Sequence, residues 1–114
     1  MVVLTKSRGS GALVVEVAGD LTAATFPVLE SHFAALLRHM PAAVVLDLSG
    51  AQSCDCTGAM ALEATARMVS EAGGHARLVV PDRIVRRLLD RTGTTERVNT
   101  FTTVAAAISD TDIS

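Results

Sequence analysis

Short apolar runs rich in valine and leucine recur along the chain, each bounded by glycine, proline or polar residues, and they predict β-strands. The runs at residues 44–48 and 76–80 are almost wholly apolar, which is typical of parallel strands covered on both faces. A third run covers residues 13–18, and we expect a weaker run at residues 2–4 to pair with it as a hairpin. A last weak strand is expected at residues 97–101.

Between these runs, apolar residues recur at spacings of three and four, which predicts helices. The predicted helices cover residues 24–39, 57–72, 81–91 and 103–108. The residues expected to face inward are Met60, Ala61, Ala64, Met68 and Val69 in the second helix and Ile84, Val85, Leu88 and Leu89 in the third. Glycines follow the second and third helices and act as stop signals.

Strands and helices alternate with short connections, and this order predicts the fold class. We expect an α/β protein with a mixed, mainly parallel sheet of four to five strands and about four helices. The 114 residues fit one domain, expected to cover residues 1–114. Hydrophobic residues make up 49% of the sequence, which supplies a core and excludes a disordered chain.

Composition and charge exclude several classes of function. The net charge of -2 gives no global attraction to nucleic acid, and the chain has no Trp or Tyr on which single-stranded bases could stack. Mean hydropathy is +0.40, yet no apolar run approaches the roughly 18–20 residues that span a bilayer. The N-terminus lacks a signal-peptide pattern. We therefore expect a cytoplasmic protein with no membrane span, no direct contact with nucleic acid and two cysteines that are thiols.

The polar segment after the central predicted strand carries the candidate chemistry, because sites in open α/β sheets lie beyond the carboxyl ends of strands. Residues 49–56 are expected to form an irregular loop, with Asp55 or Cys56 as the N-cap of the next helix. Thr57 then lies in the first turn, where free N–H groups and the helix dipole tolerate an added anion. Gly58 leaves space beside that hydroxyl for another protein's active site. The plainer interpretation is that Asp55 and Thr57 only cap a helix.

The sequence Val-Val-Leu-Asp-Leu-Ser-Gly at residues 44–50, followed by Asp55-Cys56-Thr57-Gly58, resembles the signature of STAS-domain anti-sigma-factor antagonists. In that family a hydrophobic strand ending in Asp-Leu-Ser precedes an Asp-Ser-Ser/Thr-Gly motif at a helix start. The resemblance assigns the phosphorylated residue to Thr57 and its acidic neighbour to Asp55. Cys56 replaces the usual first Ser of the motif.

An earlier motif carries the same resemblance. Residues 19–22, Gly-Asp-Leu-Thr, are similar to the family's Gly-Glu-Leu-Asp after the second strand. Thr22 replaces the Asp that in relatives helps to contact the kinase partner. The resemblance therefore implies a partner-binding rim around Thr57 that consists of Asp20, Thr22, Asp55, Cys56 and Gly58.

The function implied by the resemblance involves no reaction and no cofactor of the protein's own. The protein would bind an anti-sigma factor that is also a Ser/Thr kinase, and would thereby release a sigma factor for transcription. A phosphate on Thr57 would add about -1.5 to -2 charges. This charge would be repelled by Asp55 beside it and by Asp20 across the same rim, and the repulsion would weaken docking. The sequence leaves the oligomeric state open.

Two other functions remain open from the sequence. Cys54 and Cys56 flank an aspartate at a helix start, where the pKa of a thiol can be lowered, so a redox-sensing antagonist is one alternative. Two cysteines without a nearby pair of histidines are too few ligands for a metal ion. The other alternative is an interaction subunit of a transport or stress-signalling assembly, a role in which some STAS domains act without phosphorylation.

Arginines recur on one side of the third predicted helix. Arg83, Arg87 and Arg91 follow at intervals of four, with Arg86 beside them, and form a basic stripe opposite the apolar side. The plain interpretation is a solvated helix face. The functional interpretation is a docking site for a protein partner, anionic lipid or RNA, of which RNA is disfavoured by the overall acidity and the few aromatic rings.

Overall fold

The computed structural model describes residues 1–7, 12–39 and 43–113 of the chain. The elements are β1 (Val2–Ser7), β2 (Ala12–Leu21), α1 (Phe26–Leu36), the 3-10 turn η1 (Leu37–His39), β3 (Ala43–Cys54), α2 (Cys56–Glu71), β4 (His75–Val79), α3 (Arg83–Arg91), α4 (Thr94–Arg97), β5 (Asn99–Phe101) and α5 (Val104–Ile113). Among these described residues, no helix has the length and apolar character needed to cross a membrane.

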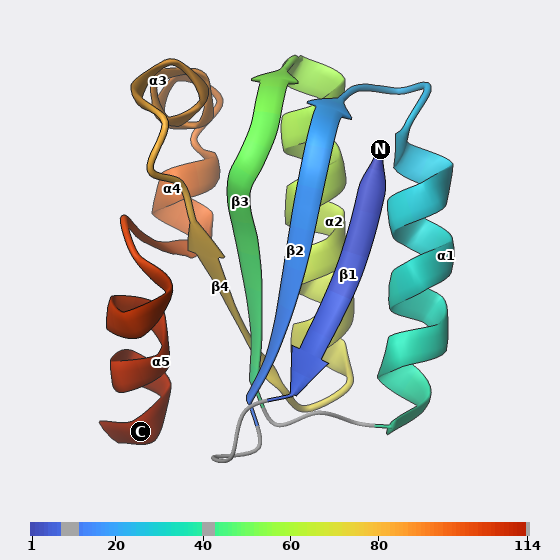
Figure 1. Ribbon diagram of the computed structural model, residues 1–114, viewed down its shortest axis with the longest axis vertical. Helices are drawn as coiled ribbons and strands as arrows, with labels where there is room; N and C mark the ends of the chain where they lie inside the picture. The colour runs from blue at the N-terminus through green and yellow to red at the C-terminus, as the bar shows by residue number, and fades with distance from the viewer. Residues whose placement is uncertain (8–11, 40–42, 114) are drawn as a thin grey trace.

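The five strands form one sheet in the order β1-β2-β3-β4-β5. Figure 1 shows β1 to β4 of this sheet side by side. β1 runs antiparallel to β2, whereas each of the other neighbouring pairs is parallel. The mixed, mainly parallel α/β sheet predicted from the sequence is therefore confirmed. The predicted pairing of the first two strands is also confirmed, while residues 8–11 of the connection between them lie outside the described part of the chain.

Neighbouring residues of the central strands pack against helices on opposite faces of the sheet. Val44 and Leu46 of β3 belong to a large core that also includes Phe33 of α1 and Leu62 of α2. Val45, between them, packs with residues of α5 in a smaller cluster on the other face (Figure 1). The central strands are apolar at almost every position because helices cover both of their faces.

The main difference from the sequence-based expectation is the length of β3. Residues 49–54 were expected in an irregular loop, but they continue β3 to Cys54 and pair with the end of β2, where Leu21 is the partner of Cys54. The register shifts twice along this pairing, which marks bulges. Most residues of the extension are exposed to solvent, so this part of β3 consists of polar residues and shows no apolar run. Without an apolar run the sequence pattern predicted a loop here.

Two helices expose residues that were expected to be buried. Met60 of α2 is 69% exposed and Ile84 of α3 is 82% exposed. The buried side of α2 is centred instead on Ala59, Leu62 and Ala66, because the many alanines of this helix allow more than one inward side. A further correction is the short helix α4, which occupies residues 94–97, so that β5 begins at Asn99 and not at residue 97.

Candidate functional site

The candidate site lies at the edge of the sheet where β2 and β3 end and α2 begins (Figure 1). A single residue, Asp55, connects β3 to α2. Thr57 and its neighbours therefore follow a hydrogen-bonded strand directly and are not carried by a long loop. This arrangement fixes their position relative to the sheet.

Asp55 is the N-cap of α2 and is one of the two residues predicted for this position. Its backbone is extended, and its Oδ1 accepts a hydrogen bond from the amide of Gly58 at 2.7 Å. Its own amide donates to the carbonyl oxygen of Leu21 at 3.2 Å, which ties the start of α2 to the end of β2. The cap thus satisfies a helix N–H and places a carboxylate within the first turn.

Thr57 is the second residue of α2 and is exposed to solvent. Cys56, which precedes it, is also exposed, and so is Asp55. The hydroxyl of Thr57 makes no hydrogen bond to any other described residue. An external enzyme can therefore reach this hydroxyl without opening the core.

The end of β2 contributes Asp20 and Thr22 to the same edge. Asp20 is exposed, and its Oδ1 accepts a hydrogen bond from Oγ of Ser53 at 2.7 Å. Thr22 is half-buried, and its amide donates to Oγ1 of Thr25, a hydroxyl that itself donates to the Asp20 carbonyl oxygen. The structure therefore brings the two predicted motifs together, because Asp20 and Ser53 are partners in the β2–β3 ladder.

Gly58 has a different role from the one expected. It is buried, and a Cβ at this position would lie 2.1 Å from the carbonyl oxygen of Leu21 and 2.7 Å from its carbonyl carbon. The missing side chain therefore allows α2 to approach the end of β2, and the space lies inside the domain. The glycine fixes the height of the Thr57 hydroxyl above the sheet and does not open the surface beside it.

The two cysteines are free thiols in unlike surroundings. Cys56 is exposed, whereas Cys54 is half-buried and packs against the main core. Burial, together with the smaller effects of the nearby charges of Asp55 and Cys56, raises the pKa of the Cys54 thiol to about 11. The lowered pKa that the redox alternative needs is therefore absent at Cys54. Within residues 1–7, 12–39 and 43–113, no group of three or more His, Cys, Asp and Glu residues is placed to hold a metal ion.

Comparison with known proteins places this geometry in a family. Residues 4–107 match the family model of the STAS domain. The chain belongs to the STAS domain family. No curated protein sequence matches it at a significant level.

Three solved proteins illustrate the structural similarity of this STAS domain. An anti-sigma factor antagonist from Mycobacterium paratuberculosis is 26% identical with a TM-score of 0.88, over 97% of this chain and 93% of that one. The anti-sigma factor antagonist SpoIIAA of Bacillus, in its unphosphorylated form, is 14% identical with a TM-score of 0.74, over 99% and 98% of the two chains. The murine anion transporter Slc26a9 is 20% identical with a TM-score of 0.78, over 91% of this chain but 18% of the transporter. The two less identical proteins show the fold alone.

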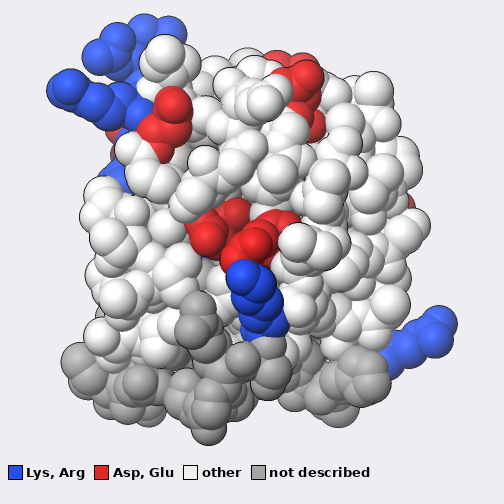
Figure 2. All heavy atoms as spheres, in the orientation of Figure 1, with Lys and Arg blue, Asp and Glu red and all other residues white. Residues whose placement is uncertain are grey.

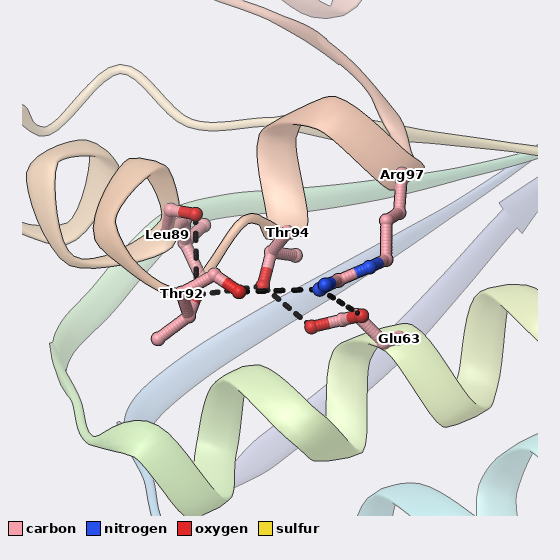
Figure 3. Close-up of polar contacts among 5 residues, drawn as sticks. All are labelled: Glu63, Leu89, Thr92, Thr94 and Arg97. Atoms are coloured by element: carbon pink, nitrogen blue, oxygen red, sulfur yellow. Dashed lines mark hydrogen bonds and ion pairs between the residues drawn. The ribbon is translucent and has the colours of Figure 1, made fainter.

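A polar cluster that the sequence did not predict joins α2 to the α3–α4 connection of this STAS domain (Figure 3). Oε2 of Glu63 accepts a hydrogen bond from Oγ1 of Thr94 at 2.9 Å, and Oε1 pairs with Arg97 at 2.9 Å. Thr94 is fully buried and also contacts the hydroxyl of Thr92 at 2.8 Å. The contacts cross about thirty residues of sequence, so no local pattern points to them.

Ser53 and Thr25 are the residues of the candidate site that sequence reasoning missed. Ser53 was grouped with the polar loop, and only the extended β3 shows that it faces Asp20. Thr25 holds the turn after β2 through its hydroxyl, which accepts from the Thr22 amide and shares its one proton between the carbonyl oxygens of Asp20, at 2.7 Å, and Thr22, at 3.2 Å. The spacing of Thr22 and Thr25 before a helical pattern is the sequence signal for such a turn.

Proposed function

We propose that this STAS domain is an anti-sigma-factor antagonist whose docking is switched by phosphorylation of Thr57. In the unphosphorylated form it binds an anti-sigma factor that is also a Ser/Thr kinase and so releases a sigma factor in the cytosol. The observation that carries the proposal is the exposed hydroxyl of Thr57 in the first turn of α2, beside a fixed carboxylate. The similarity to the mycobacterial antagonist supports the choice of partner class. The protein needs no cofactor and catalyses no reaction in this role.

Electrostatics explain why a phosphate would act as the switch. It adds about -1.5 to -2 charges at Thr57. Asp55 is held nearby by its hydrogen bond to the Gly58 amide, and Asp20 is held at the same edge by Ser53. A partner that closes over this edge must desolvate the phosphate next to these carboxylates. A penalty of about 3–4 kcal/mol would weaken binding a few hundredfold.

The phosphorylated domain is expected to remain folded. The N-terminus of α2 carries partial positive charge and N–H groups without helical partners, which favour an anion in the first turn. Thr57 is exposed, so the phosphate enters water and displaces no core residue. The modification is therefore expected to destabilise the complex with the partner and not the free protein.

The direct test is phosphorylation in vitro. The protein is incubated with ATP and each purified anti-sigma-factor kinase encoded in the same genome, and the modified residue is mapped by mass spectrometry. We expect one phosphate on Thr57 and none on the Thr57→Ala variant, while Ser70→Ala, which removes an exposed hydroxyl from the last turn of α2, remains a substrate. If no kinase modifies Thr57, the proposed switch is wrong.

Binding measurements test the consequence of the modification. Thr57→Ala should bind the same kinase as tightly as the unmodified wild type, and Thr57→Glu should bind at least tenfold more weakly because it places a negative charge beside Asp55. Equal affinities of the two variants would contradict the electrostatic mechanism.

The second candidate is an interaction subunit that docks a constant partner without phosphorylation; a domain of the same fold forms part of an anion transporter, and that likeness concerns the fold alone. In that case Thr57 would stay unmodified, and Thr57→Glu would bind the partner like the wild type. The redox-sensing version is less favoured, because a Cys54 thiol with a pKa of about 11 carries little thiolate near neutral pH.

A further inference from the structure

A groove of about 380 Å³ lies next to the switch site, between the end of β3 and α3. Its lining consists of Gln52, Ser53 and Cys54 from β3 and of Ile84, Val85, Arg87, Leu88 and Arg91 from α3. Ser53 is also the hydrogen-bond partner of Asp20. The groove and the rim around Thr57 therefore share the same edge of the sheet, and a protein that covers Thr57 can reach both.

The α3 side of the groove exposes a large apolar residue that the fold prevents from turning inward. Ile84 is 82% exposed. Asp82 caps α3 by accepting hydrogen bonds from the amides of Ile84 and Val85, at 2.8 and 3.0 Å, which sets the start of the helix. The residues that α3 buries in the core are Val85 and Leu89, so the neighbouring Ile84 is left at the mouth of the groove.

The rim of the groove is strongly basic in a protein that is acidic overall. α3 and its cap hold four of the ten Lys and Arg residues but two of the twelve Asp and Glu residues. Asp82 is occupied by its cap bonds, and Asp90 pairs with Arg86 at 3.5 Å. Among the described residues, Arg83, Arg87 and Arg91 form no ion pair. Figure 2 shows the resulting cluster of positive charge projecting at the upper left, where Figure 1 places α3.

We infer that this groove is a second contact point for the anti-sigma factor, and that it takes an acidic segment with an apolar anchor residue. The inference rests on the proposed function, since it names the kind of segment with which that partner binds. The anchor side chain lies against Ile84, Leu88 and Cys54, and its neighbouring carboxylates meet Arg87 and Arg91. Charge complementarity selects an acidic segment, because a basic one would be repelled by the rim.

The residues that line the groove also favour an acidic peptide segment over other anionic ligands. A nucleic acid or a lipid headgroup would use the arginines alone and would leave the apolar groove between β3 and α3 unfilled. A peptide side chain can fill the groove and place acidic neighbours on the rim at once. Thr57 is not among the residues that line the groove, so we expect the contact to add affinity whether or not Thr57 is phosphorylated.

The test measures the affinity of the kinase that modifies Thr57 for four purified variants. Arg87→Glu/Arg91→Glu reverses the rim charge, and Arg38→Glu is its control, because Arg38 is exposed in η1 at the end of α1. Ile84→Ser removes the apolar contact, and Val2→Ser is its control, because Val2 is 57% exposed on β1. Unchanged urea midpoints establish that each variant is folded.

We expect the double charge reversal to weaken binding about tenfold, mainly through slower association, and to reduce the dependence of the affinity on salt. Ile84→Ser should weaken binding several-fold through faster dissociation, while the two controls bind like the wild type. Thr57→Glu, measured in the same series, reports on the proposed function alone.

Two results would overturn the inference. The first is that both groove variants bind the kinase as tightly as the wild type while Thr57→Glu loses binding. This result would contradict the groove contact and leave the proposed function intact. The second is that the double charge reversal abolishes binding to vesicles of phosphatidylglycerol and phosphatidylcholine but leaves the kinase affinity unchanged. The arginines would then form a lipid-binding surface.

Discussion

Replacement of Gly58 by alanine tests whether α2 is held against the end of β2 by close packing. The added Cβ would lie 2.1 Å from the carbonyl oxygen of Leu21, so the two groups must separate by more than 1 Å to reach ordinary van der Waals contact. The two nearest atoms, the carbonyl oxygen and the carbonyl carbon of Leu21, are backbone atoms and cannot rotate away. Leu21 is buried, and its carbonyl oxygen also accepts the hydrogen bond from Asp55, so movement there disturbs the cap.

The magnitude follows from two opposing terms. Overpacking of this size costs about 3 kcal/mol, and the better helix propensity of alanine recovers at most about 1 kcal/mol. We therefore expect a net loss of at least about 2 kcal/mol in the free energy of unfolding, which corresponds to a urea midpoint lower by about 1 M. Amide exchange at Asp55 should become faster in the same variant, because its hydrogen bond to Leu21 is strained or lost.

Gly73→Ala provides the matched control. Gly73 has a φ of +89° and nothing within 4 Å of an added Cβ, so alanine there costs about 1 kcal/mol through backbone strain and leaves the Asp55 amide unchanged. A Gly58→Ala variant with a urea midpoint within error of the wild type, and with protected Asp55, would refute the packing argument.

Two further predictions concern the polar cluster of α2 and the thiols. Glu63→Ala removes the carboxylate that accepts from the buried Thr94 hydroxyl and should lower the free energy of unfolding by about 2 kcal/mol. Arg97→Ala should lower it by less than about 1 kcal/mol, because the Arg97 side chain is 63% exposed. Equal losses of the two variants in urea denaturation would contradict this difference. With a pKa of about 11, about one Cys54 side chain per thousand is a thiolate at pH 8. Iodoacetamide should therefore modify the exposed Cys56 first and reach Cys54 only as the pH approaches 11, as followed by mass spectrometry. Rapid modification of both thiols at pH 8 would contradict the raised pKa of Cys54.

The sequence predicts the sheet well where burial imposes a pattern. Val44, Leu46 and Leu78 lie in continuous apolar runs because helices cover both faces of the central strands, and the predicted strands over these apolar runs are confirmed. The N-cap at Asp55 is equally local, since it depends on one carboxylate three residues before an amide. Interactions between neighbours in sequence are therefore the ones that the pattern can reveal.

The remaining features depend on contacts between distant segments. Ser53 looks like a loop residue until β2 pairs with it, and Glu63 looks like a surface carboxylate until Thr94 and Arg97 are placed beside it. Ile84 fits the apolar side of α3 by spacing alone, and its exposure becomes clear only when Val85 and Leu89 are placed in the core. In each case the deciding contacts are made with other elements of the fold.

The proposed modification site at Thr57 follows directly on the extended β3 and is held in place by contacts with the end of β2. Leu21 is 1% exposed, its carbonyl oxygen accepts the Asp55 amide, and Gly58 packs directly against that oxygen. Three interactions thus converge on one buried residue and hold the first turn of α2 at a fixed height above the sheet. Thr57 is consequently exposed on a rigid element, so a phosphate there changes the charge that a partner meets while the positions of the surrounding groups stay the same. The proposed switch would therefore act through the interface, and we expect the free energy of the modification to appear in the affinity for the partner.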